Sequence, residues 1–297
     1  MRRWSAAAAV LALLAFLPAC RLPSSGEHTV VTSFYPLYFI AVRVAGRYND
    51  VVDLTPPGVE PHEHELTVRQ VAQVDLARVG FYEQGVSPSV DQAMVNDSPG
   101  HTLDVTSAVP LHAAEGDYNE ETVNERDPHF WQDPVLMARA ARAFASTMAD
   151  ADPAHAPFYR QRGDALARQL RTLDRDYRST LRTCRIRTLV VSHDAFEYVG
   201  LRYHLDVVPI AGLEPDAEPS LQRIQQIADL VRERGITTVF YETLASPALA
   251  RSLASDAGVA TAVLDPIEGV TADDPEATYL TLMRQNLAAI TRASECS

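Results

Sequence analysis

Residues 154–183, AHAPFYRQRGDALARQLRTLDRDYRSTLRT, carry the longest helical pattern in the chain. Apolar residues recur there at spacings of 4, 3, 4 and 4, with arginines and aspartates between them, which predicts one amphipathic helix. These residues are Leu166, Leu170, Leu173, Tyr177 and Leu181. A helix of about 28 residues would be roughly 40 Å long. Few single domains need a helix of that length, so the pattern favours a helix that spans two lobes.

Short strand patterns and helix patterns alternate on both sides of this segment. The strand patterns are 29–34, 51–54, 78–81, 187–192, 207–210, 237–241 and 260–264. The helix patterns are 36–46, 67–74, 134–149, 220–234, 246–257 and 278–293. Such alternation is typical of a parallel sheet covered by helices on both faces. The sequence therefore predicts an α/β fold with two doubly wound lobes, 29–153 and 184–297, joined by a rigid linking helix over 154–183.

The beginning of the chain has the pattern of an export signal. Two arginines precede an apolar run that is too short to span a membrane. The run ends in LPAC at 17–20, which resembles the lipobox of bacterial lipoproteins, where the cysteine becomes the lipidated first residue. We therefore predict a signal peptide over 1–19, a tether over 20–28, and a lipid on Cys20 that anchors the protein to the outer side of the cell membrane. A secreted protein with an incidental Cys20 is the alternative.

Charge and cysteine content narrow the functional classes. The net charge is -13, and all 26 basic residues are arginine. The lack of lysine excludes Schiff-base chemistry and P-loop phosphate binding. An acidic chain without basic blocks also argues against nucleic acid as a partner. After Cys20, only Cys184 and Cys296 remain, and an even remainder in an exported chain predicts a disulfide between them. Two unrelated buried thiols are the alternative.

Three histidines and one glutamate stand where a parallel sheet would place a ligand. His62, His193 and Glu268 follow predicted strands, and His129 lies in the motif Asp-Pro-His-Phe-Trp. In open parallel sheets, ligands bind outside the carboxyl ends of the strands. Three imidazole nitrogens and one carboxylate oxygen suit Zn²⁺, whereas Mg²⁺ and Mn²⁺ prefer more oxygen. These residues predict a four-coordinate metal site in a cleft between the lobes, with His64 as a rival of His62.

Five stretches resemble the metal-binding solute-binding proteins of ABC transporters, the cluster that captures zinc or manganese, and within it the zinc lipoproteins. They occur in the order of that family and cover essentially the whole mature chain. They are SFYPL at 33–37, PGVEPHEHE at 57–65, DPHFWQDP at 127–134, SHDAFEY at 192–198 and LDPIEGVT at 264–271. The resemblance implies two α/β lobes joined by a rigid helix, with the metal between them.

The resemblance also implies a ligand set. The first three ligands fall on His62, which directly follows Pro61, on His129 and on His193. Manganese-type members tend to have glutamate at the third place, so His193 favours zinc. The fourth ligand falls on Glu268, with Asp265 as the alternative. Glu65, Asp194 and Glu242 are candidates, by location only, for the groups that orient the imidazoles.

The function implied is capture of extracytoplasmic Zn²⁺ and its delivery to the transmembrane subunits of an ABC-type permease. We expect a lipid-anchored monomer, small lobe shifts and no catalysis, because four protein ligands leave no open position for an activated water. Many zinc members carry a long His-rich loop, but the loop here, 112–127, is short and acidic. The alternatives are a manganese-binding member, a zinc-dependent hydrolase with Glu268 or Glu242 as general base, and a cell-adhesion lipoprotein whose histidines are incidental.

Overall fold

A computed structural model describes residues 29–96, 100–113, 126–213, 215, 217–274 and 276–297. The predicted signal peptide and tether, together with most of the acidic loop at 112–127, lie outside the described residues. None of the helices in the described part of the chain combines the length and the apolar character that a membrane crossing requires.

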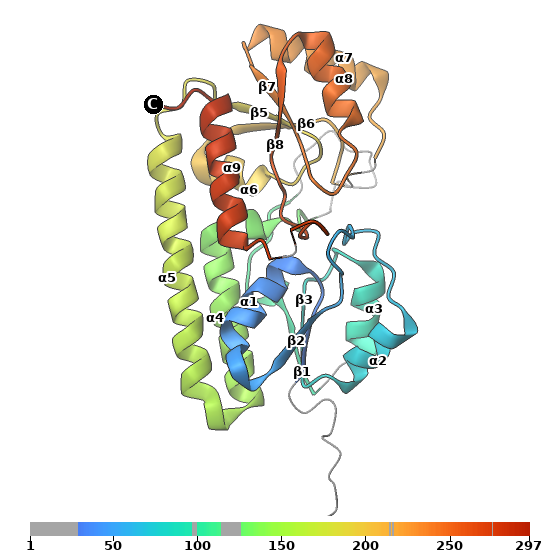
Figure 1. Cartoon of the computed structure of the whole chain (residues 1–297), viewed down its shortest axis with the longest axis vertical. Helices are drawn as coiled ribbons and strands as arrows, with labels where there is room; N and C mark the ends of the chain where they lie inside the picture. Colours follow the sequence, from blue (N-terminus) through green and yellow to red (C-terminus); the bar gives the residue numbers. More distant parts are fainter. Residues whose placement is uncertain (1–28, 97–99, 114–125, 214, 216, 275) are drawn as a thin grey trace, which may run out of the picture.

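The first lobe is built on a parallel sheet with the strand order β2-β1-β3-β4 (Figure 1). Its strands are β1 (Thr29–Thr32), β2 (Asp50–Asp53), β3 (Val79–Tyr82) and β4 (His101–Asp104). Its helices are α1 (Tyr35–Ala45), α2 (Val68–Leu76), α3 (Pro88–Asn96) and α4 (Pro134–Ala151). Alternate residues of β1 face opposite layers, since Val30 packs with α1 and α4 while Val31 packs with α2 and α3.

The second lobe repeats this plan with the strand order β6-β5-β7-β8, again parallel. Its strands are β5 (Thr188–Val191), β6 (Asp206–Pro209), β7 (Thr238–Tyr241) and β8 (Ala260–Val263). Its helices are α6 (Glu197–Tyr203), α7 (Leu221–Glu233), α8 (Ala248–Ala257) and α9 (Tyr279–Ala293). Helices α6 and α9 pack on one face of the sheet, and α7 and α8 pack on the other. The predicted α/β architecture of two doubly wound lobes is confirmed.

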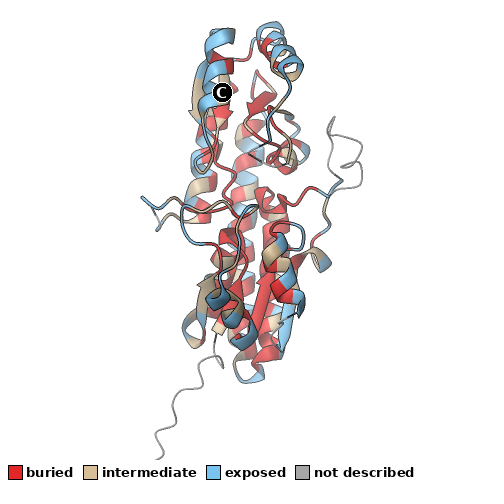
Figure 2. Cartoon of the chain, turned by 90° about the vertical axis from the view of Figure 1, so that its right-hand side faces the viewer, coloured by how far each residue is buried: buried red, intermediate tan, exposed pale blue. Residues whose placement is uncertain are grey.

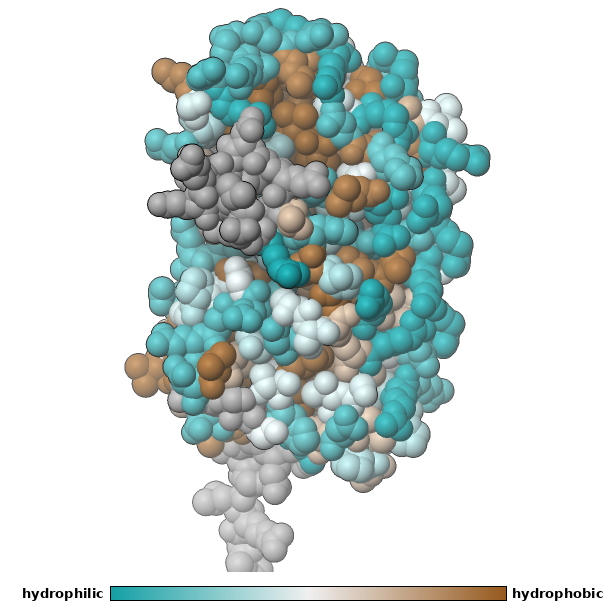
Figure 3. Space-filling model, turned by 180° about the vertical axis from the view of Figure 1, so that it is seen from behind, coloured by the Kyte–Doolittle hydropathy of each residue, from teal (hydrophilic) through white to brown (hydrophobic). Residues whose placement is uncertain are grey.

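Helix α5 (Ala156–Leu181) runs along the side of both lobes (Figure 1). Its 26 residues correspond to about 39 Å. It contacts α1 and α4 in the first lobe and α6 and α9 in the second. Gly163 permits the close approach of α4 and α5, because a Cβ there would lie 2.6 Å from the Cβ of Ala145. The outward face of α5 is polar, and the surface seen from behind mixes hydrophilic areas with apolar patches (Figure 3).

One hydrophobic core extends through both lobes along α5. It contains Phe34 and Phe144 of the first lobe, Leu170 of α5, and Phe196 and Tyr279 of the second lobe. The buried layer continues from one lobe into the other (Figure 2). Because the two lobes share this core, changing their relative position would expose apolar surface, which makes α5 a stiff connection.

The predicted disulfide is present, between Cys184, shortly after α5, and Cys296, after α9. It fastens the C-terminal end of the chain to the beginning of the second lobe. Backbone hydrogen bonds from Arg185 and Ile186 to the carbonyl of Ser294 reinforce the same junction.

Candidate metal centre

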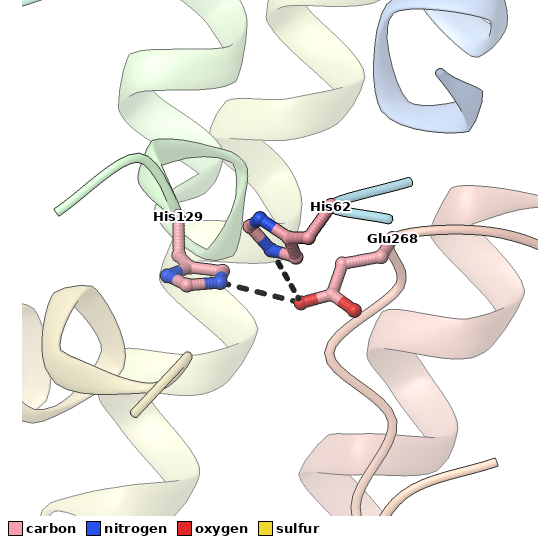
Figure 4. A group of neighbouring side chains, drawn as sticks. All are labelled: His62, His129 and Glu268. Atoms are coloured by element: carbon pink, nitrogen blue, oxygen red, sulfur yellow. Dashed lines mark ion pairs between the residues drawn. The ribbon is translucent and has the colours of Figure 1, made fainter. Parts of the chain in front are cut away.

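Glu268 is the residue on which three imidazoles converge. Its Oε1 lies 3.1 Å from Nε2 of His193, 3.2 Å from Nε2 of His129 and 3.8 Å from Nε2 of His62. All four side chains are at most 3% exposed. Figure 4 shows His62, His129 and Glu268 pointing toward one another from separate segments. The four residues predicted from the sequence are therefore brought together.

The topology explains this convergence. His62 lies on the loop between β2 and α2, and His129 directly precedes the 3-10 turn η3 (Phe130–Gln132). His193 and Glu268 lie on the loops that follow β5 and β8. These loops leave the carboxyl ends of parallel strands or lead into the next helix, so the two sheets present them to each other. Each lobe contributes two of the four residues.

Two groups of His, Cys, Asp and Glu in the described part of the chain are close enough to hold a metal ion. One contains His62, His129 and Glu268, and the other contains His193, Glu242 and Glu268. Glu268 belongs to both groups and joins them. Both oxygens of Glu242 lie 3.0 Å from Nδ1 of His193, on the ring edge opposite Nε2. Glu242 therefore orients His193 and leaves Nε2 directed at Glu268.

Asp127 has the same role for His129. Its Oδ1 accepts hydrogen bonds from Nδ1 of His129, at 2.7 Å, and from the backbone N–H of the same residue, at 2.9 Å. Its main-chain carbonyl accepts a 2.9 Å hydrogen bond from the hydroxyl of Tyr198 in the other lobe. Asp127 thereby fixes the orientation of the imidazole and directs Nε2 toward Glu268.

The charges in this buried group are mutually dependent. Burial alone would raise the pKa of Glu268, but the positive charge of His193 and hydrogen bonds from the imidazoles hold it well below its usual range. Burial alone would lower the pKa of His129, but hydrogen bonds to Asp127 and Glu268 raise it to about 9. Burial also opposes a charge on His193, yet Glu268 and Glu242 raise its pKa well above the ordinary value. Without a bound cation, these contacts favour the protonated form of His129 at neutral pH, and the surroundings of His193 act in the same direction.

The two rival positions lie outside this convergence. The ring of His64 is half-buried, and its Nε2 lies 3.3 Å from the side-chain amide of Gln70 on α2. Both carboxylate oxygens of Asp265 are engaged elsewhere: Oδ1 accepts from the backbone N–H of Ile267 in its own loop at 2.7 Å, and Oδ2 accepts from the hydroxyl of Thr243 in the loop after β7 at 3.1 Å. The geometry thus favours His62 over His64 and Glu268 over Asp265.

The three residues predicted to orient the imidazoles lie in different surroundings. Glu242 contacts His193, whereas Glu65 is exposed and Asp194 is buried with its backbone N–H donating to Gly212. Sequence reasoning missed Asp127, although a signal exists in the repeated pattern of an acid, a proline and a histidine. Asp127 stands two residues before His129, just as Glu60 stands two residues before His62.

In the copy of this pattern at residues 60–62, Oε2 of Glu60 accepts a 2.9 Å hydrogen bond from the backbone N–H of His62. Burial raises the pKa of Glu60 to about 7. In both copies the acid fixes the backbone of the histidine that follows it.

Two parallel α/β lobes on a stiff helix, with a buried cluster of three histidines and one glutamate between them, define the class of two-lobed solute-binding proteins. Residues 30–293 match the model of the family described as the periplasmic component A of the zinc-uptake complex, and the chain belongs to this family. It is 32% identical, over 94% of its length, to the zinc-binding lipoprotein AdcA of Streptococcus pneumoniae. The chain spans 59% of the length of that relative.

Two other matches extend over nearly the whole length of the matched protein. The high-affinity zinc uptake system protein ZnuA of Bacillus subtilis is 28% identical, with 97% of each chain covered. Among solved structures, the laminin-binding protein Lmb of Streptococcus agalactiae, described as a bifunctional protein with adhesin and metal transporting activity, has a TM-score of 0.80 at 28% identity. That match covers 90% of this chain and 99% of Lmb. The Zn(II)-bound AdcA of S. pneumoniae has a TM-score of 0.77 at 31% identity, covering 91% of this chain and 58% of AdcA.

Proposed function

We propose that this protein captures Zn²⁺ outside the cytoplasm and delivers it to an ABC-type permease for uptake. This proposal rests mainly on one observation. Three imidazole Nε2 atoms from both lobes converge on the buried Oε1 of Glu268, at 3.1, 3.2 and 3.8 Å. The zinc-binding names of the relatives support the same reading. The proposed ligands are His62, His129, His193 and Glu268.

Unpaired polar atoms in the same place support binding of a cation. Nε2 of His62 and Oε2 of Glu268 are buried without a hydrogen-bond partner. Burying such atoms is costly, and native proteins leave few of them unpaired. A cation at the point where the imidazoles converge would accept electron pairs from both of these atoms. The donor set of three nitrogens and one oxygen is the one that zinc accepts in tetrahedral sites, which favours zinc over manganese.

The protein's part in transport is binding and transfer, without chemistry on the metal. Four protein ligands would complete the coordination of zinc and leave no open position for a water nucleophile. We therefore propose a carrier and not a hydrolase. We further propose that it acts as a monomer, held at the outer side of the cell membrane by a lipid on Cys20. If an otherwise intact Cys20→Ala protein stayed bound to membranes, this anchor would be excluded.

Zinc titration of alanine variants at each histidine tests the site. His62→Ala, His129→Ala and His193→Ala should each weaken binding at least 100-fold, because each removes a ligand and leaves its partner carboxylate uncompensated. His64→Ala is the matched control for His62→Ala and should keep the affinity within twofold. Glu268→Gln should weaken binding, while Asp265→Asn, which retains an acceptor, should have a much smaller effect. Unchanged affinity in all three histidine variants would contradict the proposal.

A further inference from the structure

The turn that carries Glu268 has an unfavourable backbone conformation. Ile267, directly before Glu268, has a φ of 61°, in the left-handed region. A β-branched side chain is poorly suited to that region, because its Cβ substituents crowd the backbone. Ile267 is fully buried, so solvent does not relieve the crowding. The surroundings of the turn must therefore hold this conformation in place.

The second lobe supplies part of this hold. Asp265 Oδ1 accepts the backbone N–H of Ile267 at 2.7 Å. Asp265 is fixed in turn by Asn286, which accepts its N–H at 2.9 Å and donates to its carbonyl at 2.6 Å. These contacts hold the N–H side of the planar peptide group between Pro266 and Ile267.

The first lobe holds the carbonyl end of the same peptide group. The carbonyl of Pro266 accepts a hydrogen bond from Nε1 of Trp131, at 2.7 Å, and another from the side-chain amide of Gln132. Both donors are at most 1% exposed. We name these two hydrogen bonds the Pro266 clamp. With its N–H held by one lobe and its C=O by the other, the peptide group cannot flip to relieve Ile267.

The Pro266 clamp directly links two ligand-bearing segments. Trp131 and Gln132 follow His129 by two and three residues, and Pro266 precedes Glu268 by two. Trp131 also packs against the His129 ring, with 5.1 Å between ring centroids, and its carbonyl accepts the hydroxyl of Tyr279 at 2.6 Å. A lobe movement that separates His129 from Glu268 must therefore break the clamp as well.

We propose that Trp131 and Gln132 are positioning residues that hold Glu268 against the metal and set the rate of metal release. This inference rests on the proposed function of the site. While the clamp is closed, Glu268 is kept at the convergence of the imidazoles. When the clamp opens, the peptide group is free to flip, Ile267 relaxes to a negative φ and Glu268 leaves the site, so metal loss and lobe opening form one step.

The test is stopped-flow release of zinc from the full-length protein into excess chelator. Trp131→Phe and Gln132→Met keep most of the side-chain volume and remove one donor each. Each should raise the release rate about tenfold and leave the association rate within twofold. Tyr177→Phe is the matched control, since it removes a buried 2.6 Å hydrogen bond from a hydroxyl to the carbonyl of Met283, away from the site. It should leave the release rate within twofold.

A double-mutant cycle separates positioning of Glu268 from general loosening of the protein. If the clamp acts through the Glu268 carboxylate, Gln132→Met should change the release rate less than twofold in a Glu268→Gln background. An equal effect in both backgrounds, or release rates for Trp131→Phe and Gln132→Met that match Tyr177→Phe, would overturn the inference. Failure of the unaltered protein to bind zinc would instead refute the proposed function.

Discussion

Zinc binding should release about one proton or more at pH 8. Added zinc should displace protons because the pKa of two proposed ligands is raised. His129 has a pKa of about 9, and that of His193 is raised well above its ordinary value. An imidazole must lose its proton from Nε2 before that atom can bind a metal. At pH 8 His129 is therefore mainly protonated, so zinc must displace its proton, and the raised pKa of His193 acts in the same direction.

The expected magnitude follows from His129. At pH 7 a group with a pKa of about 9 is deprotonated about 1% of the time, so its proton weakens zinc binding roughly 100-fold, or about 2.7 kcal/mol. His193 acts in the same direction. The apparent affinity should therefore keep increasing as the pH rises from 6.5 to about 9. Imidazoles with the ordinary value of about 6.5 would instead give a plateau above pH 7.5.

Isothermal titration calorimetry in two buffers of different ionisation enthalpy counts these protons. We expect about one proton or more per zinc at pH 8 in the unaltered protein and a smaller number in Asp127→Asn, which loses the carboxylate that raises the pKa of His129. His64→Ala is the control and should leave the count unchanged. Release of fewer than half a proton per zinc at pH 8 would refute the proposed charge state of the site.

Three further outcomes are expected. Glu242→Gln should lower zinc affinity about 10- to 100-fold in a titration, because it loses the charge that orients His193, whereas Glu65→Gln should not. Replacing Cys184 and Cys296 by serine should lower the free energy of unfolding in urea by about 2–4 kcal/mol while the zinc stoichiometry stays at one. Without metal, the folded protein should lose stability as the pH rises from 6.5 through about 9, because the pKa of His129 is higher in the folded state; constant urea midpoints at pH 6.5 and 9 would contradict this.

Much of the fold could be predicted from local patterns. The strands at 79–82 and 188–191 are buried along their whole length, so they read as unbroken apolar or aromatic runs. The long helix was recognisable because its buried face recurs at helical spacing. In contrast, β4 was missed because its sequence, HTLD, is polar and lies at the sheet edge. Helix α6 was missed because its seven residues, EYVGLRY, are too few for a clear period.

The four converging side chains could be predicted from the sequence, whereas most of the contacts that support them could not. His62, His193 and Glu268 follow strands, and the geometry of a parallel sheet gathers such positions at one edge. The contact between Trp131 and Pro266, by comparison, joins residues 135 positions apart in different lobes. It depends on how the lobes pack along α5, which no local pattern encodes. The positive φ of Ile267 is likewise imposed by its neighbours, against the preference of the residue itself.

X-ray absorption at the zinc edge, measured on the full-length protein loaded with one equivalent of zinc, examines the ion's own neighbours. The arrangement of His62, His129, His193 and Glu268 predicts four light-atom ligands at about 2.0–2.1 Å, with the multiple scattering of three imidazoles. His193→Ala should reduce that contribution to two. A spectrum dominated by oxygen, or one that His193→Ala leaves unchanged, would mean that the metal is held elsewhere.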